Sequence, residues 1–251
     1  MAEVKRARAV PISAAELDTL LRAHHKNTLQ GSVDMSGIDD LVASAFAYLI
    51  QEARALERSP LTKHMAYLFV LRHTTLPAAI GHQLAGKVCD GGVFAGSTTT
   101  ELEAVKDAFT ATFVQTLSEP SIMSSVLADL AKACIADPAT QGLFQPIFFF
   151  KGFQAITLHR VAHRLWILGD ACSRGAALLL QSRMAELFAV DIHPGATIGD
   201  GVMLDHASGI VIGATAILGN DVYMLRTPPH GLNPPALRAA PRNDQRVRLS
   251  S

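Results

Sequence analysis

The feature that most constrains the fold is a six-residue repeat of aliphatic side chains in residues 190–225. Two runs of three aliphatic residues are separated by one eight-residue step, and they are Ile192, Ile198, Leu204, Ile212, Leu218 and Met224. Glycines and other small residues fill the gaps, at a density that would destabilise a helix. A period of six also differs from the two-residue period of an ordinary strand. The pattern therefore predicts about two coils of a parallel β-helix over residues 190–225, with the aliphatic side chains in its core.

The segment before the repeat, residues 39–189, has the spacing of amphipathic helices. Apolar side chains recur at three- and four-residue steps between residues 42 and 56, which indicates one buried helical stripe. Thr100 and Glu103 have the spacing of a capping box and predict the start of a second helix. Further helices are expected from about residue 121, over residues 148–168 and over residues 173–188. The sequence thus predicts an α+β protein, with an all-helical N-terminal domain followed by the β-helix.

Both ends of the chain lack these patterns. Residues 1–38 have no apolar core of a secretory signal, and we expect a flexible segment in which His24 and His25 are inert. Residues 226–251 contain five prolines and five arginines but continue no six-residue repeat. Because proline cannot donate to a strand ladder, this tail is predicted to be disordered. The last coil is then expected to expose an uncovered strand edge.

Composition excludes several classes of protein. The 22 basic and 22 acidic side chains balance, which argues against a nucleic-acid binder and against a polybasic membrane-surface protein. A hydrophobic fraction of 49% is too high for a disordered chain, and no apolar run approaches the roughly 18–20 residues of a membrane helix. Cys89, Cys134 and Cys172 are odd in number and widely spaced, which fits a reducing compartment and predicts a cytoplasmic protein.

One acidic residue and one histidine in the repeat are candidates for chemistry. Asp191 and His206 are 15 residues apart, close to the roughly 18 residues of one coil, so they are expected on neighbouring corners roughly 5 Å apart along the axis. A carboxylate beside an imidazole would make it a general base able to deprotonate an alcohol. The alternative is that Asp191 caps a turn and His206 fills a corner.

Other polar residues have weaker patterns. His159 and His163 are one helical turn apart and could bind a metal, but the sequence supplies no third ligand, so packed or solvent-facing histidines and no metal are expected. Asp137 precedes Pro138, which predicts the end of a helix and allows a simple turn role for the aspartate.

Three motifs resemble serine O-acetyltransferases, which are hexapeptide-repeat acyltransferases. They are Phe-Lys-Gly-Phe-Gln-Ala at residues 150–155, Val-Asp-Ile-His-Pro at residues 190–194 and Gly-Val-Met-Leu-Asp-His-Ala-Ser-Gly-Ile-Val-Ile-Gly at residues 201–213. The similarity extends from about Asp137 to Leu225 and is weaker in the preceding helices.

The resemblance implies a reaction and a set of roles. His206 would be the general base that takes the proton of the L-serine hydroxyl, Asp191 would orient its ring, and Asp137 and Asp205 would bind serine, through its ammonium group. Acetyl-CoA would be the co-substrate, with no resident cofactor, and O-acetyl-L-serine for cysteine biosynthesis would be the product. The family also implies a left-handed β-helix, trimers or hexamers, and a C-terminal peptide that docks in cysteine synthase.

The chain departs from the family after Leu225. In the family the coils continue and carry an Arg-His pair that helps to bind serine and most of the acetyl-CoA surface, whereas the tail here continues no repeat and lacks the docking peptide. We therefore expect a C-terminally truncated or altered family member with low turnover. The alternative function is a catalytically impaired homologue that acts as an oligomerising or regulatory subunit.

Overall fold

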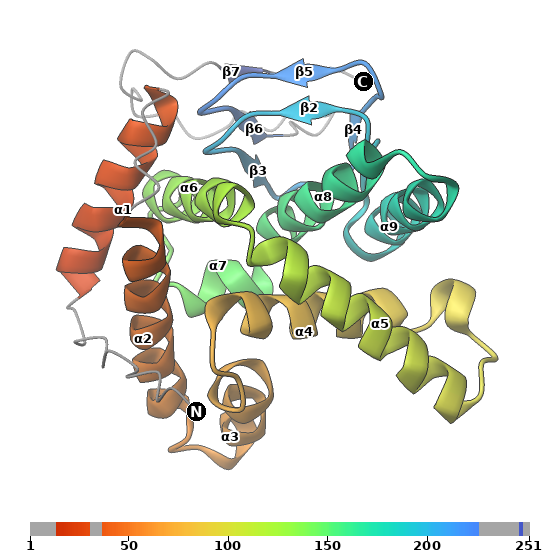
Figure 1. Ribbon diagram of the computed structural model, residues 1–251. Helices are drawn as coiled ribbons and strands as arrows, with labels where there is room; N and C mark the ends of the chain where they lie inside the picture. The colour runs from red at the N-terminus through yellow and green to blue at the C-terminus, as the bar shows by residue number, and fades with distance from the viewer. Residues whose placement is uncertain (1–13, 31–36, 226–245, 248–251) are drawn as a thin grey trace, which may run out of the picture.

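A computed structural model describes residues 14–30, 37–225 and 246–247 (Figure 1). The helices are α1 (Ala14–Leu29), α2 (Ile38–Leu56), α3 (Pro60–Ala66), the π-helical turn η2 (Tyr67–Leu71), α4 (Leu76–Cys89), the short 3-10 turn η3 (Gly92–Phe94), α5 (Thr99–Leu117), α6 (Pro120–Ala136), α7 (Phe144–Phe149), α8 (Lys151–Leu168) and α9 (Ala171–Phe188). The strands are β1 (Val190–Ile192), β2 (Thr197–Ile198), β3 (Met203–Asp205), β4 (Ile210–Ile212), β5 (Ile217–Leu218), β6 (Tyr223–Leu225) and β7 (Arg246–Val247). A helical part followed by short parallel strands is therefore confirmed.

Local chemistry sets two helix boundaries differently from the sequence prediction. The capping box of α5 is formed by Thr98 and Glu101, two residues before the expected pair Thr100 and Glu103. The single helix expected over residues 148–168 is divided into α7 and α8, because Phe150 has an extended backbone with φ −80° and ψ 106°. This break turns the start of α8 toward β3, with which α8 is in contact.

The first helix corrects the expectation of a flexible segment over residues 1–38. Residues 14–29 form α1, which packs on α6 (Figure 1). Leu17 and Leu21 are buried, and one turn later His25 is only 7% exposed. Its Nε2 lies 3.1 Å from Oδ1 of Asp221, so His25 is not inert but joins α1 to the strands. The sequence pattern did not reveal this helix because half of its buried stripe is polar.

The strands form two coils, which we define as β1–β3 and β4–β6. Each strand of the first coil pairs in parallel with its counterpart in the second, and every pairing, such as Asp191 with Val211, has an offset of 20 residues. The two residues beyond the expected 18 lie in the turn between β3 and β4. There His206 and Ala207 both have left-handed backbone angles, with φ of 53° and 51°. This turn, residues 205–209, is called the His206 turn below.

The edge of the second coil is covered in part. β7 pairs in parallel with β6 at Tyr223 and Met224, so residues 246–247 are ordered as a strand and the edge is not fully open as expected. The remainder of the predicted disordered tail, residues 226–245 and 248–251, lies outside the described residues, as do residues 1–13 and 31–36.

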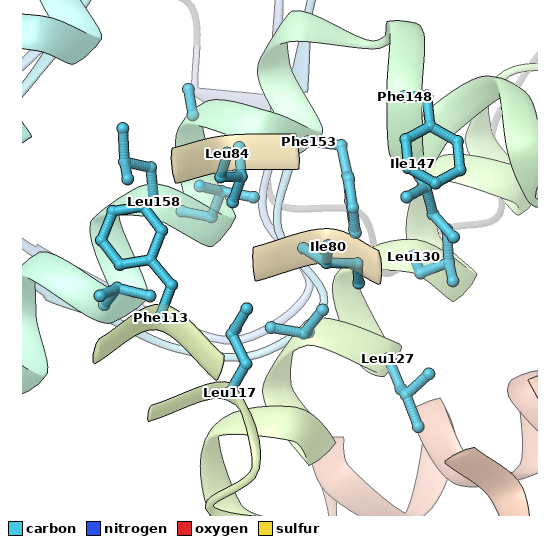
Figure 2. Close-up of a cluster of buried hydrophobic side chains, with 14 of the residues drawn as sticks. Ile80, Leu84, Phe113, Leu117, Leu127, Leu130, Ile147, Phe148, Phe153 and Leu158 are labelled. Carbon is cyan, nitrogen blue, oxygen red and sulfur yellow. The ribbon is translucent and has the colours of Figure 1, made fainter. Parts of the chain in front are cut away.

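The helical part has a large apolar core, and its helices contact the two coils. Large apolar side chains from α4, α5, α6, α7 and α8 interlock there (Figure 2), and those labelled are Ile80, Leu84, Phe113, Leu117, Leu127, Leu130, Ile147, Phe148, Phe153 and Leu158. α8 and α9 also contact β1, and α6 and α8 contact β3. Within the described ranges, no helix has the length and apolarity needed to cross a membrane.

The N-terminus of α7 is held by a carboxylate of α2. Glu52 accepts hydrogen bonds from the backbone amides of Leu143 and Phe144 at 3.0 and 2.9 Å. Burial raises the pKa of Glu52 to about 7, although these two amides act to lower it. Between pH 4.5 and 7 the folded chain thus binds a proton more tightly than the unfolded chain, so the free energy of unfolding falls as the pH rises through this window.

Replacing Glu52 with glutamine should remove this pH dependence while it keeps an oxygen acceptor for the two amides. Between pH 5 and pH 8, the free energy of unfolding of Glu52→Gln should rise by about 1 kcal/mol relative to that of the native chain. This is less than the full pKa shift would give, because the carboxyl group is only partly buried. Urea denaturation at both pH values measures this difference. Glu57→Gln, at the exposed end of α2, is the matched control. If the free energy of unfolding changed with pH by the same amount in Glu52→Gln and in the native chain, the expectation would be contradicted.

Candidate active site

A cavity of about 240 Å³ lies where the end of α6, the α7–α8 junction and β3 meet. Three of the four candidate residues from the sequence line it, namely Asp137, Asp205 and His206, and the fourth, Asp191, does not. The remaining lining residues are Asp129, Ala133, Phe149, Phe150, Lys151, Gly152, Phe153, Val202, Met203 and Leu204. The fold therefore brings together residues that are almost 70 positions apart in the sequence.

His206 is presented to solvent at the edge of this cavity. Its side chain is 87% exposed, and Nε2 lies 3.8 Å from Oδ1 of Asp205, beyond hydrogen-bond distance. The hydroxyl of Tyr223 donates to the other oxygen of Asp205 and fixes that carboxylate. Left-handed backbone at two consecutive non-glycine residues is strained, and strain of this kind is concentrated at functional sites. The turn with the two additional residues therefore exposes the imidazole of His206 beside the carboxylate of Asp205, which Tyr223 holds in place.

Asp191 does not contact His206 within this chain. Its Oδ1 accepts a hydrogen bond from Nε2 of Gln181 in α9 at 2.7 Å, and its strand partner is Val211. The expected juxtaposition assumed a coil of about 18 residues, whereas the coil has 20 and the additional residues lie in the turn that includes His206. The role of Asp191 as the partner of the base remains a prediction.

Asp137 ends α6 as its C-cap residue, as the following proline predicts. Its Oδ1 accepts a hydrogen bond from the amide of Ala139 at 2.8 Å. Asp137 therefore stabilises a turn and also lines the cavity, so the turn role and a binding role are compatible.

A buried ion pair supports the base of the cavity. Asp129 is fully buried and accepts two hydrogen bonds from Arg160, at 2.7 and 2.8 Å. Asp129 also accepts from the amide of Val202, while Arg160 donates to the carbonyl oxygen of Gly199. Burial alone would lower the pKa of Arg160, but the Asp129 carboxylate opposes it and leaves that pKa above its usual value. The pair fastens α6 and α8 to the first coil.

The two helical histidines are packed rather than arranged around a metal. His159 is 2% exposed, and burial, with the nearby charge of Arg160, lowers its pKa to about 3. Nδ1 of His163 donates to the carbonyl oxygen of Pro194 at 2.7 Å. Throughout the part of the chain that the structure describes, no group of three or more His, Cys, Asp or Glu side chains could hold a metal ion.

Comparisons with known proteins identify one family. The sequence model "Serine acetyltransferase, N-terminal" matches residues 46–157. The chain is 43% identical over 172 residues to probable serine acetyltransferase 5 of Oryza sativa subsp. japonica, covering 68% of this chain and 47% of that protein. Soybean serine acetyltransferase complexed with serine is 36% identical with a TM-score of 0.63, and the match covers 72% of this chain and 70% of that one.

The chain belongs to the serine acetyltransferase family. A further solved member, serine acetyltransferase from Brucella abortus strain S19 in complex with coenzyme A, is 30% identical with a TM-score of 0.64, covering 74% of this chain and 69% of that chain. The family resemblance of the sequence motifs is thus confirmed. The chain spans about half the length of the first curated family members that it matches.

The sequence patterns did not predict one contact at this cavity. Lys151, the first residue of α8, donates from Nζ to the Ser208 hydroxyl in the His206 turn. Both residues lie in the family motifs, but no spacing rule connects residues 57 positions apart. The signal that could have found this contact is Gly152, whose position allows the start of α8 to approach the strands.

Gly152 is required by a close approach between backbones. A Cβ atom at this position would lie 1.9 Å from the carbonyl oxygen of Leu204. Gly152→Ala should therefore push α8 away from β3 and lower the free energy of unfolding by about 1–3 kcal/mol, as overpacking does. Chemical denaturation measures the change.

Gly175 in α9 is the matched control for Gly152→Ala, because a Cβ there meets nothing within 4 Å. Gly175→Ala is expected to be neutral or to stabilise the helix by up to about 1 kcal/mol. Equal effects of the two substitutions would show that the approach of α8 to Leu204 is not tight.

Proposed function

We propose that this chain is a serine O-acetyltransferase that transfers the acetyl group of acetyl-CoA to the hydroxyl of L-serine, in the route from serine to cysteine. The observation that carries the proposal is that Asp137, Asp205 and His206 line the same cavity in a member of this family. Support comes from the relatives, one solved with serine and one with coenzyme A. Acetyl-CoA is a co-substrate, and no resident cofactor is required.

The proposed reaction needs one proton acceptor and a binding site for an ammonium group. The imidazole of His206 takes the proton from the serine hydroxyl, whose oxygen attacks the carbonyl carbon of the acetyl thioester. The carbon–sulfur bond then breaks, and the thiolate of coenzyme A takes the proton back from the imidazolium. Asp137 and Asp205 bind the serine ammonium group, since charge-assisted hydrogen bonds to carboxylates suit it.

Asp191 has the role of orienting the His206 ring in this proposal. To do so it exchanges its hydrogen bond with Gln181 for one to the imidazole. The two coils form a left-handed β-helix, and copies of the chain assemble as trimers or hexamers in the cytoplasm. Cysteine synthase is a further partner to be tested.

A thiol-release assay tests the proposed function. Purified chain, acetyl-CoA and L-serine should yield free coenzyme A at a rate that depends on serine, together with O-acetyl-L-serine identified by mass spectrometry. Thiol release that is the same with and without L-serine would contradict the proposal.

A second function, as an oligomerising or regulatory subunit, is favoured by one observation. The Asp191 carboxylate is bound to Gln181, and no carboxylate of the described residues lies within hydrogen-bond distance of His206. In that case the chain is inactive alone and co-purifies with a longer member of the family. An active chain that forms no complex with such a member would exclude this function.

A further inference from the structure

Lys151 brings a positive charge into a cavity that is otherwise acidic. Among the described residues that line the cavity, Lys151 is the one lysine or arginine, and it shares the wall with Asp137 and Asp205. Asp129 also reaches the cavity, but its charge is neutralised by the buried Arg160. The open charges are therefore two carboxylates and one ammonium group.

The position of Lys151 is fixed at both ends of the side chain. Its backbone begins α8, where the next residue, Gly152, lies against the Leu204 carbonyl. Its Nζ donates to the hydroxyl of Ser208, three residues after Asp205 in the His206 turn. The ammonium group thus lies beside the turn that holds the candidate base, and it has three donors, so a bond to Ser208 leaves capacity for a ligand.

These charges match the two ends of an amino-acid zwitterion. We propose that Lys151 binds the α-carboxylate of the amino-acid substrate, while Asp137 and Asp205 bind its ammonium group. The inference rests on the proposed serine acetyltransferase function and adds the group that selects for the carboxylate. Three attachment points, at the ammonium group, the carboxylate and the hydroxyl, then fix the hydroxyl toward His206 and restrict the substrate to one enantiomer.

A positioning role through Ser208 is the competing explanation for Lys151. If Lys151 only holds the His206 turn, its removal affects ligands with and without a carboxylate equally. If it binds the carboxylate, only ligands that carry this group lose affinity. The ratio of two affinities therefore separates the roles.

Calorimetric binding of L-serine and of L-serine methyl ester, whose carboxylate is masked, tests the proposal. The native chain should bind L-serine at least 10-fold more tightly than the ester, because a charge-assisted hydrogen bond contributes roughly this factor or more. Lys151→Met should weaken L-serine binding about 10- to 100-fold and leave the affinity for the ester within about 2-fold. Lys151→Arg should retain the preference, and so should Ser208→Ala, which removes the hydroxyl partner alone.

The outcomes separate this proposal from the proposed function. Binding of neither ligand by the native chain would overturn both. L-serine binding that is unaffected by Lys151→Met, or an equal loss for both ligands, would overturn only the assignment of Lys151. Circular dichroism shows whether Lys151→Met folds. If it does not, the affinities of the native chain and of Lys151→Arg for L-serine and for the ester still test the proposal. Equal affinities for the two ligands would contradict recognition of the carboxylate.

Discussion

Replacing His206 with alanine is expected to lower kcat/KM for acetyl transfer to L-serine by a factor of about 10²–10⁴, the contribution of a positioned general base. The imidazole is the one group at the cavity mouth that the proposed mechanism uses to take the serine proton. Because its side chain is 87% exposed, the substitution removes little packing, and the thermal unfolding temperature should stay nearly the same. The thiol-release assay measures the rate.

Two further variants make the His206 result specific. His206→Asn introduces a residue that tolerates the left-handed backbone at position 206. It should be as inactive as the alanine variant. His64→Ala removes another exposed histidine, in α3, and should leave the rate unchanged. An active native chain whose His206→Ala variant keeps most of its rate would exclude His206 as the base.

Replacing Arg160 with leucine is expected to lower the free energy of unfolding by about 3–5 kcal/mol, as the removal of one partner of a buried ion pair does. Asp129 would be left fully buried with its charge uncompensated, and the link to the Gly199 carbonyl would be lost. Chemical denaturation followed by circular dichroism measures the change. The cavity wall should be disturbed as well, since Asp129 also holds the amide of Val202.

The double variant Asp129→Leu and Arg160→Leu is the decisive control for this pair. It removes both charges and should recover much of the stability lost in the single variant. Arg22→Leu breaks the ion pair with Asp18, in which both side chains are nearly half exposed, and should cost less than about 1 kcal/mol. An effect of Arg160→Leu as small as that of Arg22→Leu would contradict the importance of the buried pair.

Two differences between the sequence-based prediction and the structure have a common physical cause. Helix α1 was missed because its buried stripe includes His25, whose partner Asp221 lies almost 200 positions away in the second coil. Asp191 was expected beside His206, but in this chain its carboxylate accepts a hydrogen bond from Gln181 of α9, and its role as the partner of the base stays a prediction. In each case a polar side chain found a partner that no local spacing specifies.

The sequence by itself determined those features of this protein that depend on periodic spacing or on short motifs. The six-residue period predicted the short parallel strands, the three- and four-residue spacing predicted several of the helices, such as α2 and α9, and the motifs at residues 150–155, 190–194 and 201–213 identified the family. These are local properties, because periodicity depends only on which residues face the core. Only the tertiary structure decided the 20-residue register and the outward His206 turn. It alone also decided the contact of Lys151 with Ser208 and the burial of Asp129 with Arg160, because these depend on how distant backbones pack against one another.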